Sequence, residues 1–332
     1  MIALFLVGCS AMLTEGDWFV VRNDGADLPV TVRGDLGAES FVVWLAGGPG
    51  DPVVVDRGDA TDQLEEDLGV VYWDQRGAGS AGGNATPESF TIEQYVDDTE
   101  AVVDVIEELY APEHLFLLGH SWGGTLGTAY LLDAERQAGI SGWIDVDGNH
   151  DNPLIFPMKI AWLGTYADGQ IAKGVDVAHW TEVRDWCASE PPLTVDNWHE
   201  WNELVDDTNA IFHDADVGFD VDFDLLFLSP ESPLAYLAVN DGYADASMHT
   251  DDSSFEALSF SDEMDAITTP SLLLWGRHDG IVPIDAMDAA RTSLSNADVT
   301  SVVLEDSAHI PFLEEPQAFA EAVLDFVRRT TR

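Results

Sequence analysis

Positive charge is the scarcest property of this 332-residue chain. Two lysines, Lys159 and Lys173, and 11 arginines stand against 62 acidic residues, for a formal net charge of -49. Proteins that bind nucleic acids neutralise phosphates with clustered Lys and Arg, so a nucleic-acid partner is excluded. Repulsion among so many carboxylates is relieved when salt screens it within about 10 Å. The composition therefore favours an acidic protein that is adapted to high salt, a halophilic protein. The alternative is that the acidic surface serves only to keep the protein soluble.

Cysteine is nearly absent as well. Cys9 and Cys187 are the two cysteines, too few for a disulfide framework, and neither belongs to a Cys-x-x-Cys or Cys/His cluster with metal-ligand spacing. We therefore expect no structural zinc, no other metal and no cofactor.

Hydrophobic runs long enough to cross a bilayer are missing from the sequence. The short apolar run at the start ends in Leu6-Val7-Gly8-Cys9, which resembles the lipobox of bacterial lipoproteins. Residues 1–17 are thus predicted to be a signal segment, with membrane anchoring through a lipidated Cys9 and a place in the cell envelope. The run lacks the positively charged start of an export signal. An N-terminal β-strand or a loose end, with a cytoplasmic location, is the alternative.

Short apolar runs alternate with longer amphipathic stretches, which is typical of βαβ units around a mostly parallel sheet. The composition, 46% hydrophobic with 11 Trp, is that of a chain with a sizeable core. We predict an α/β fold whose core comprises residues 18–151 and 263–332. The expected strands are 18–22, 28–33, 41–45, 70–73, 115–118, 143–146, 271–275 and 300–304, and the expected helices are 92–110, 122–138, 284–293 and 316–329.

The stretch from 152 to 262 breaks this alternation. It has no strand-length apolar run bounded by turns, and its Trp and acidic residues recur at helical spacing. We predict a helical cap inserted into the α/β core.

The motif Gly119-His120-Ser121-Trp122-Gly123 follows an apolar strand and precedes a helix. This is the G-x-S-x-G pattern of a nucleophile elbow in the setting that the pattern requires. Glycines allow a tight turn in which a Cβ would clash, and the turn exposes the serine. Ser121 is therefore the predicted nucleophile, and an ordinary helix N-cap is the alternative.

The partners of Ser121 follow in the chain order nucleophile, acid, histidine. Asp279 comes after the predicted strand 271–275, and His309 after the predicted strand 300–304. His309 is the predicted general base, and Asp279 would fix its tautomer and stabilise the imidazolium. Asp285 and Asp306 lie nearby in sequence and are alternative acids.

Acyl transfer also needs donors for the developing oxyanion. The glycine-rich Ala46-Gly47-Gly48-Pro49-Gly50 follows the strand 41–45 directly, so its backbone can approach a substrate closely. We predict that the N–H of Gly48, or else of Gly47, acts together with the N–H of Trp122. A plain turn is the alternative reading of this loop.

Three segments together resemble the proline iminopeptidase family of α/β-hydrolases: Ala46 to Gly50, Trp73-Asp74-Gln75-Arg76-Gly77-Ala78-Gly79-Ser80, and Gly119 to Gly124. The resemblance covers about 28–149 and 268–329 and fades in the cap. It implies the α/β-hydrolase fold, a Ser-Asp-His triad, no metal, and release of an N-terminal residue, often proline, from short peptides. Asp74 and Arg76 are expected to brace their loop rather than take part in the chemistry.

The chain departs from that family at two places. Ala46 stands where the family usually has His, and Trp198-His199-Glu200-Trp201-Asn202 lacks the terminal Glu of a Trp-x-x-Trp-Glu element that binds the substrate amine. Glu200 and Glu203 are candidate substitutes, with Trp201 beside them as a candidate wall of the site. Solvated surface charge is the alternative for both glutamates.

Three functions remain open at this stage. The first is an aminopeptidase acting on small peptides, the second a carboxylesterase acting on small acyl esters, which needs no amine-binding carboxylate, and the third an inactive α/β-hydrolase that serves as a binding protein. The serine in the elbow argues against dehalogenase and epoxide hydrolase chemistry, which uses a carboxylate there.

Overall fold

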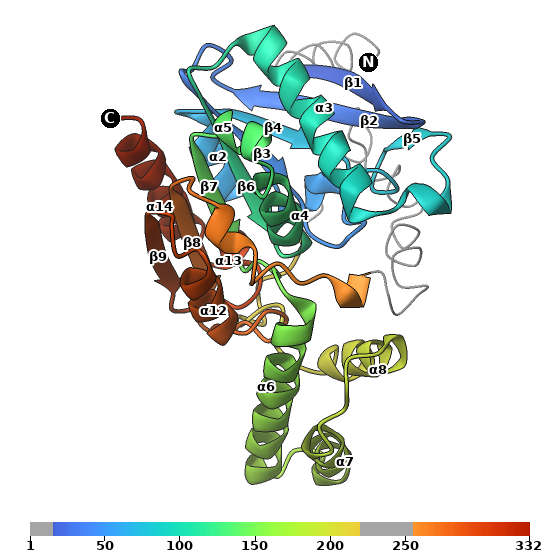
Figure 1. The fold of residues 1–332 in the computed structure, drawn as a ribbon. Helices are drawn as coiled ribbons and strands as arrows, with labels where there is room; N and C mark the ends of the chain where they lie inside the picture. The colour runs from blue at the N-terminus through green and yellow to red at the C-terminus, as the bar shows by residue number, and fades with distance from the viewer. Residues whose placement is uncertain (1–15, 220–254) are drawn as a thin grey trace, which may run out of the picture.

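The computed structural model describes residues 16–219 and 255–332, and its centre is one nine-stranded sheet (Figure 1). The strand order is β1-β2-β4-β3-β6-β7-β8-β9, with the short β5 paired to β2. Strands from β4 to β9 along this order run parallel, whereas β1, β2 and β5 pair antiparallel. The strands are β1 (Asp17–Asn23), β2 (Ala26–Gly34), β3 (Ser40–Leu45), β4 (Gly69–Trp73), β5 (Gly82–Gly83), β6 (His114–His120), β7 (Gly142–Val146), β8 (Ser271–Gly276) and β9 (Val299–Leu304).

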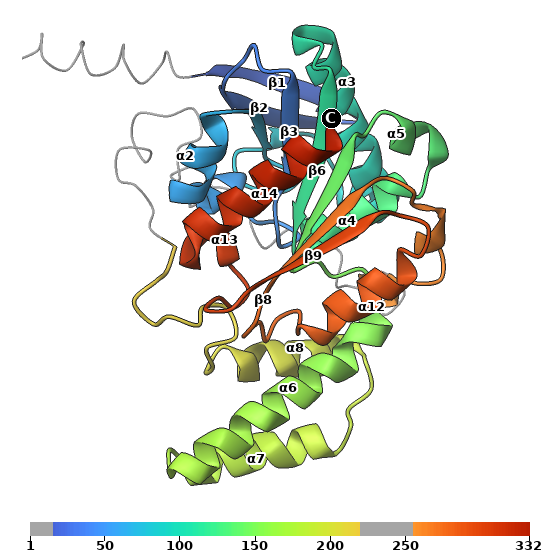
Figure 2. The same cartoon turned by 90° about the vertical axis from the view of Figure 1, so that its left-hand side faces the viewer.

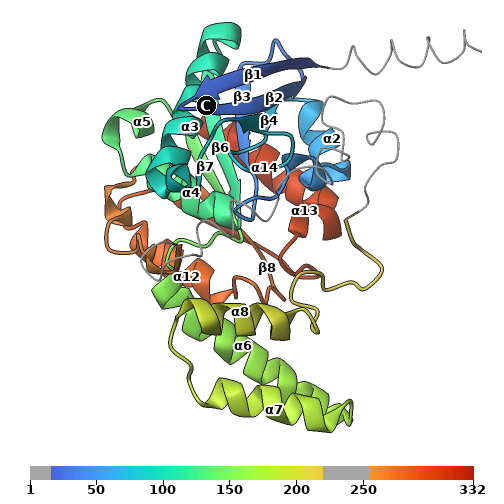
Figure 3. The ribbon, with the colours of Figure 1, turned by 90° about the vertical axis from the view of Figure 1, so that its right-hand side faces the viewer.

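Helices cover both faces of this sheet. Figure 2 views the face under α2 and α14, and Figure 3 the opposite face, under α3 and α4. Every residue of β3, β4, β7 and β8 is buried, as expected for strands covered on both sides. The predicted α/β-hydrolase architecture is confirmed. The covering helices are α2 (Asp59–Glu65), α3 (Ile92–Tyr110), α4 (Trp122–Leu131), α5 (Ala134–Ala138), α12 (Asp285–Ser293), α13 (Pro311–Glu314) and α14 (Pro316–Thr330).

The single helix predicted over 122–138 was wrong. The chain forms α4 and α5 instead, with a break at Leu132 and Asp133. The Asp133 carboxylate accepts hydrogen bonds from the N–H groups of Glu135 and Arg136, at 2.8 and 3.1 Å. The hydrogen bonds of a capping side chain start a new helix and replace the backbone hydrogen bonds that would continue the first one. The apolar periodicity does not reveal such a break.

Three helices leave the sheet after β7 and form a separate layer beyond its carboxyl edge (Figures 1 and 3). These cap helices are α6 (Asn152–Lys173), α7 (Val177–Ala188) and α8 (Val195–Val205). The Asp151 side chain caps α6 by accepting from the Leu154 N–H, and Gly174 ends it in the left-handed conformation. They fill the first half of the predicted insertion, and the chain returns through the short η3 (Phe255–Ala257).

The predicted signal segment, including Cys9, lies largely outside the described residues, so lipid anchoring and location stay predictions. Within the described chain, the helices are all too short or too polar to cross a membrane.

A buried ion pair holds the loop after β4 against α3. The guanidinium of Arg76 donates two hydrogen bonds of 2.6 Å to the Asp98 carboxylate, and both side chains are fully buried. The Asp74 carboxylate accepts from the N–H groups of Val53 and Ser80. Asp74 and Arg76 thus brace their loop, as the sequence predicted.

Asp98→Asn should therefore destabilise the fold strongly, because it leaves the Arg76 guanidinium buried without its counter-charge. Breaking a buried pair of this kind costs about 3–5 kcal/mol. Urea unfolding followed by circular dichroism measures the loss. Asp67→Asn, which removes the exposed partner of Arg328, is the matched control and should leave the unfolding midpoint unchanged. Equal behaviour of the two variants would contradict the bracing role.

Candidate active site

Ser121 sits on a sharp turn between β6 and α4. Its backbone has φ 54° and ψ -114°, a conformation that non-glycine residues rarely adopt. The turn is tight because a Cβ at Gly119 would overlap the Gly123 carbonyl, and a Cβ at Gly123 would overlap the Leu45 carbonyl. Strain held by such close packing is a mark of the nucleophile elbow.

The loop after β7 fixes the same turn from the other side. The Ser121 N–H donates to the Val146 carbonyl at 3.0 Å, and the Ser121 carbonyl accepts from the Asn149 N–H at 3.1 Å. The end of β7 and the loop that follows it therefore both hold the backbone of Ser121 in place.

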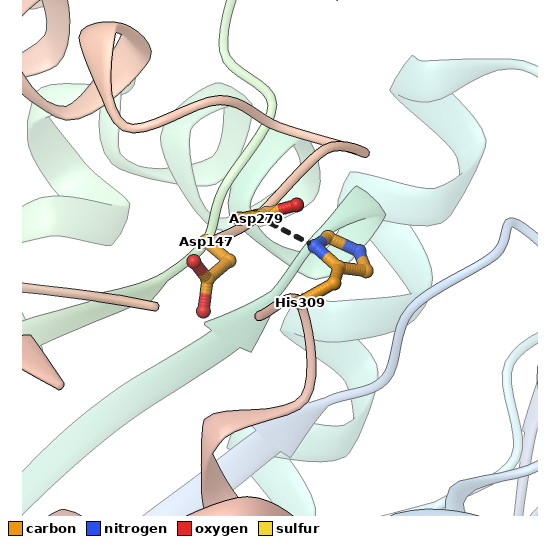
Figure 4. Close-up of side chains that lie close together, drawn as sticks. All are labelled: Asp147, Asp279 and His309. Atoms are coloured by element: carbon orange, nitrogen blue, oxygen red, sulfur yellow. Dashed lines mark hydrogen bonds and ion pairs between the residues drawn. The ribbon is translucent and has the colours of Figure 1, made fainter. Parts of the chain in front are cut away.

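Asp279 and His309 meet at the carboxyl ends of β8 and β9 (Figure 4). His309 Nδ1 lies 2.8 Å from Asp279 Oδ2, and Asp279 is 1% exposed. The other carboxylate oxygen of Asp279 accepts from the N–H groups of Ile281 and Val282 at 2.7 and 2.9 Å. We assign the proton to Nδ1, because the carboxylate accepts there, which leaves Nε2 free to act as a base.

The alternative acids are placed elsewhere. Asp285 and Asp306 are both exposed, and His278 stacks on His213 with ring centroids 3.7 Å apart. Of the acids considered from the sequence, only Asp279 is hydrogen-bonded to His309 within the described chain.

His120 connects the elbow to the histidine loop. Burial and the neighbouring His309 lower the pKa of His120 to about 3, so its ring is neutral. Its Nε2–H donates to the His309 carbonyl at 2.8 Å, and the two rings lie 4.8 Å apart. His309 is thereby held beside the residue that precedes Ser121. Ser121 Oγ makes no hydrogen bond within the described residues; such contacts commonly tighten only around a bound substrate.

The glycine-rich loop lies against the elbow. A Cβ at Gly47 would stand 3.2 Å from His120 Nδ1 and 3.5 Å from the Ser121 Cβ. Gly48 has φ 109°, where a side chain would overlap the Gly50 backbone. Gly47 is therefore next to Ser121, and glycine is required at Gly48.

Gln75 ties the two predicted oxyanion elements together. Its Nε2 donates to the Ala46 carbonyl at 3.1 Å, and its Oε1 accepts from Trp122 Nε1 at 2.9 Å. Gln75 is buried, so both bonds are shielded from water. Sequence reasoning singled out the Asp-Gln-Arg-Gly segment but not this bridge, because the bridge joins residues that are far apart in sequence.

Asp147 is a second buried carboxyl group that the sequence analysis missed. One ligand atom each from Asp147, Asp279 and His309 lie within 4.8 Å of one another. Asp147 Oδ1 accepts from the Gly276 N–H at 2.9 Å. Burial, followed by the charge of Asp279, raises the pKa of Asp147 well above its ordinary value, so the group is a neutral acid that can donate to Asp279. The Asp-Gly directly after the strand 143–146 was the available signal.

These three groups fit a shared proton better than a metal ion. The Asp279 carboxylate is already occupied by His309 and two backbone N–H groups, and burial raises the pKa of Asp147, which favours its protonated form. A metal ion needs deprotonated ligands with open lone pairs.

The residues of the cap that were predicted to contact the substrate differ in their exposure. Glu200 and Glu203 are exposed on α8, whereas Trp201 is 1% exposed. Its ring centroid lies 4.6 Å from Lys159 Nζ. Burial lowers the pKa of Lys159 to about 7, and attraction to Asp279 opposes that shift. The structure thus places Trp201 beside Lys159, and the role of the two glutamates in binding stays a prediction.

Gln75→Met should slow the reaction, because the Ala46 carbonyl and Trp122 lose the side chain that aligns them. Loss of a residue that positions catalytic groups typically costs about tenfold or more in kcat/KM, measured with a chromogenic substrate. Two unmet buried groups also cost about 1–3 kcal/mol each in stability. Gln137→Met is the control, since Gln137 is buried and bonds Leu131 and Thr268 far from Ser121. A control that lost as much activity would contradict the positioning role.

Asp147→Asn should gain stability over the wild type as pH rises. The folded chain holds the Asp147 proton that the unfolded chain releases above about pH 4, so folding of the wild type weakens with pH until the folded-state pKa is passed. Asn cannot ionise and keeps the same shape. Urea unfolding at pH 5, 7 and 9 should show a growing gap between the two proteins. A constant gap would mean that Asp147 is charged in the folded state.

Comparisons with known proteins agree with this architecture. The model of the "Alpha/beta hydrolase family" matches residues 42–322. A "Probable aminopeptidase" of Bacillus subtilis is 25% identical over 290 residues, covering 85% of this chain and 87% of that protein. The proline iminopeptidase of Thermoplasma volcanium is 34% identical over 116 residues, 34% of this chain and 36% of that protein.

A solved structure shows the same fold. The crystal structure of the proline iminopeptidase of Mycobacterium smegmatis superposes with a TM-score of 0.64 at 17% identity, covering 95% of this chain and 98% of that one. The matched family, the sheet order and the Ser121 turn lead to one conclusion: the chain belongs to the α/β-hydrolase family and is similar to its proline iminopeptidases.

Proposed function

We propose that this α/β-hydrolase is a serine aminopeptidase that releases an N-terminal, proline-like residue from small peptides through an acyl-enzyme. The observation that carries the proposal is the buried Asp279–His309 hydrogen bond of 2.8 Å beside the strained Ser121 turn. The aminopeptidase and proline iminopeptidase relatives support the peptide substrate.

The chemistry follows from these positions. His309 Nε2 removes the proton of Ser121 Oγ as the oxygen attacks the carbonyl carbon of the substrate. The N–H groups of Gly48 and Trp122 stabilise the oxyanion, with a contribution of about 3 kcal/mol for one donor. His309 then gives the proton to the leaving amine, and the C–N bond breaks. A water molecule, deprotonated by His309, cleaves the ester of Ser121 and restores the serine.

Another candidate for the amine contact is buried and lies outside α8. Glu256 lies in η3 and is 3% exposed. Its neighbour Phe255 packs on Trp122, with ring centroids 5.8 Å apart. A carboxylate in such a dry position attracts an ammonium group more strongly than an exposed one. Glu256 is therefore our candidate for the amine contact.

The second candidate function is a carboxylesterase acting on small acyl esters. The exposure of Glu200 and Glu203 favours it, because an ester demands no amine-binding carboxylate. The third reading, an inactive binding protein, needs a broken catalytic set, and labelling of Ser121 by a fluorophosphonate decides it directly.

A side-by-side rate assay of proline p-nitroanilide and p-nitrophenyl butyrate, in low and molar salt, tests the proposal. We expect turnover of the prolyl amide that is lost when its amine is acetylated and that falls by several orders of magnitude in Ser121→Ala. Glu256→Gln should raise KM for the amide and leave the ester unaffected. Turnover of the ester alone would establish the esterase, and a dependence on molar salt would support halophilic adaptation.

A further inference from the structure

Lys159 is a buried lysine that the proposed reaction steps leave without a task. It lies on α6, is 2% exposed, and is one of only two lysines in the chain. Removing an ammonium group from water costs free energy unless the group is paired. The cost is visible in its lowered pKa of about 7.

Two indole rings surround the ammonium group. Lys159 Nζ lies 4.6 Å from the ring centroid of Trp198 and 4.6 Å from that of Trp201. Cation–π attraction offsets part of the desolvation. Within residues 16–219 and 255–332, however, Nζ donates no hydrogen bond and forms no salt bridge. Its three N–H donors are therefore available to an acceptor that is not part of the described protein.

The lysine belongs to an aromatic cluster that reaches the nucleophile. Trp198 packs on Phe255 at 5.3 Å, and Phe255 packs on Trp122, the residue after Ser121. α6 itself begins just after the Asn149 loop that bonds the Ser121 carbonyl, and Lys159 is two turns into the helix, about 10 Å along its axis. The charge of Asp279 also acts on Lys159 and opposes the fall in its pKa.

We infer that Lys159 is a specificity-determining residue that binds a carboxylate of the substrate. In a short peptide this is the C-terminal carboxylate, so the preferred substrates are dipeptide-sized and end in a free acid. The inference rests on the proposed hydrolase function and deepens it. The chain's net charge of -49 repels anions, and a buried cation beside the site is what allows an anionic group to be held there. Glu256 and Lys159 would then hold the two ends of a zwitterion.

A matched pair of substrates tests the inference. Prolyl-alanine is compared with prolyl-alanine amide, because the two peptides differ only in the C-terminal carboxylate, which is part of the leaving group. For Lys159→Met, the ratio of kcat/KM for the acid over the neutral partner should fall about tenfold or more, because a charge-assisted hydrogen bond is lost. Lys159→Arg keeps the cation and should retain a larger share of the ratio.

Lys173→Met is the matched control. Lys173 is the other lysine, lies on the same helix and is exposed at its end, so its removal changes the net charge equally without touching the site. The control should leave the ratio at the wild-type value. A fall of similar size in both variants would show that only the overall charge matters and would overturn the inference.

A binding measurement tests the role of Lys159 without any turnover of the substrate. In the Ser121→Ala background, prolyl-alanine should raise Tm more than prolyl-alanine amide does, and Lys159→Met should abolish that difference. An unchanged difference would mean that Lys159 only packs between its two indoles. Failure of the hydrolase proposal is seen separately, as absence of fluorophosphonate labelling and of turnover for every substrate, and the Tm comparison still decides the role of Lys159.

Discussion

The close approach of backbones around Ser121 is the constraint on which the rest of the site depends. The turn can hold φ 54° because Gly119 and Gly123 let β6, α4 and the end of β3 meet without side chains between them. A strained residue persists only where its surroundings over-determine it. Here the Val146 carbonyl and the Asn149 N–H from the β7 side provide that support. In the sheet, β6 lies between β3 and β7, so both neighbouring strands end beside this turn.

Buried polar groups connect the loops around this edge of the sheet. Gln75 joins the Ala46 loop to Trp122, and Arg76, next in sequence, is fixed by Asp98. His120 bonds the carbonyl of His309, and Asp147 bonds the N–H of Gly276 before the Asp279 loop. Each of these groups is shielded from water, where a hydrogen bond is electrostatically stronger and its loss more costly. These hydrogen bonds thus connect residues that are far apart in the sequence.

The difference between local patterns and long-range contacts explains which parts of the site the sequence could predict. Residues that follow the ends of parallel strands, such as Ser121, Asp279 and His309, are tied to local patterns of strand, turn and helix that can be read directly. Gln75 and Asp147 act through partners that are far away in the sequence, and no local pattern carries those contacts. The break between α4 and α5 was missed for a different reason, because Asp133 caps a new helix within a stretch that keeps helical periodicity. In the cap, the exposed Glu200 and buried Lys159 show that charge alone does not reveal which side chain faces inward.

The position of Lys159 follows from the same electrostatics that shape the whole surface. In a chain with 62 acidic residues, one more surface carboxylate has little individual effect, and an exposed cation is surrounded by negative charge. A cation that is to act on a substrate must be taken out of that field, into a place where water and salt do not screen it. Burial between Trp198 and Trp201 does this, at a cost that appears as the lowered pKa of Lys159. Burial of the ammonium group between two indole rings is therefore the physical basis of the charge discrimination that we propose for Lys159.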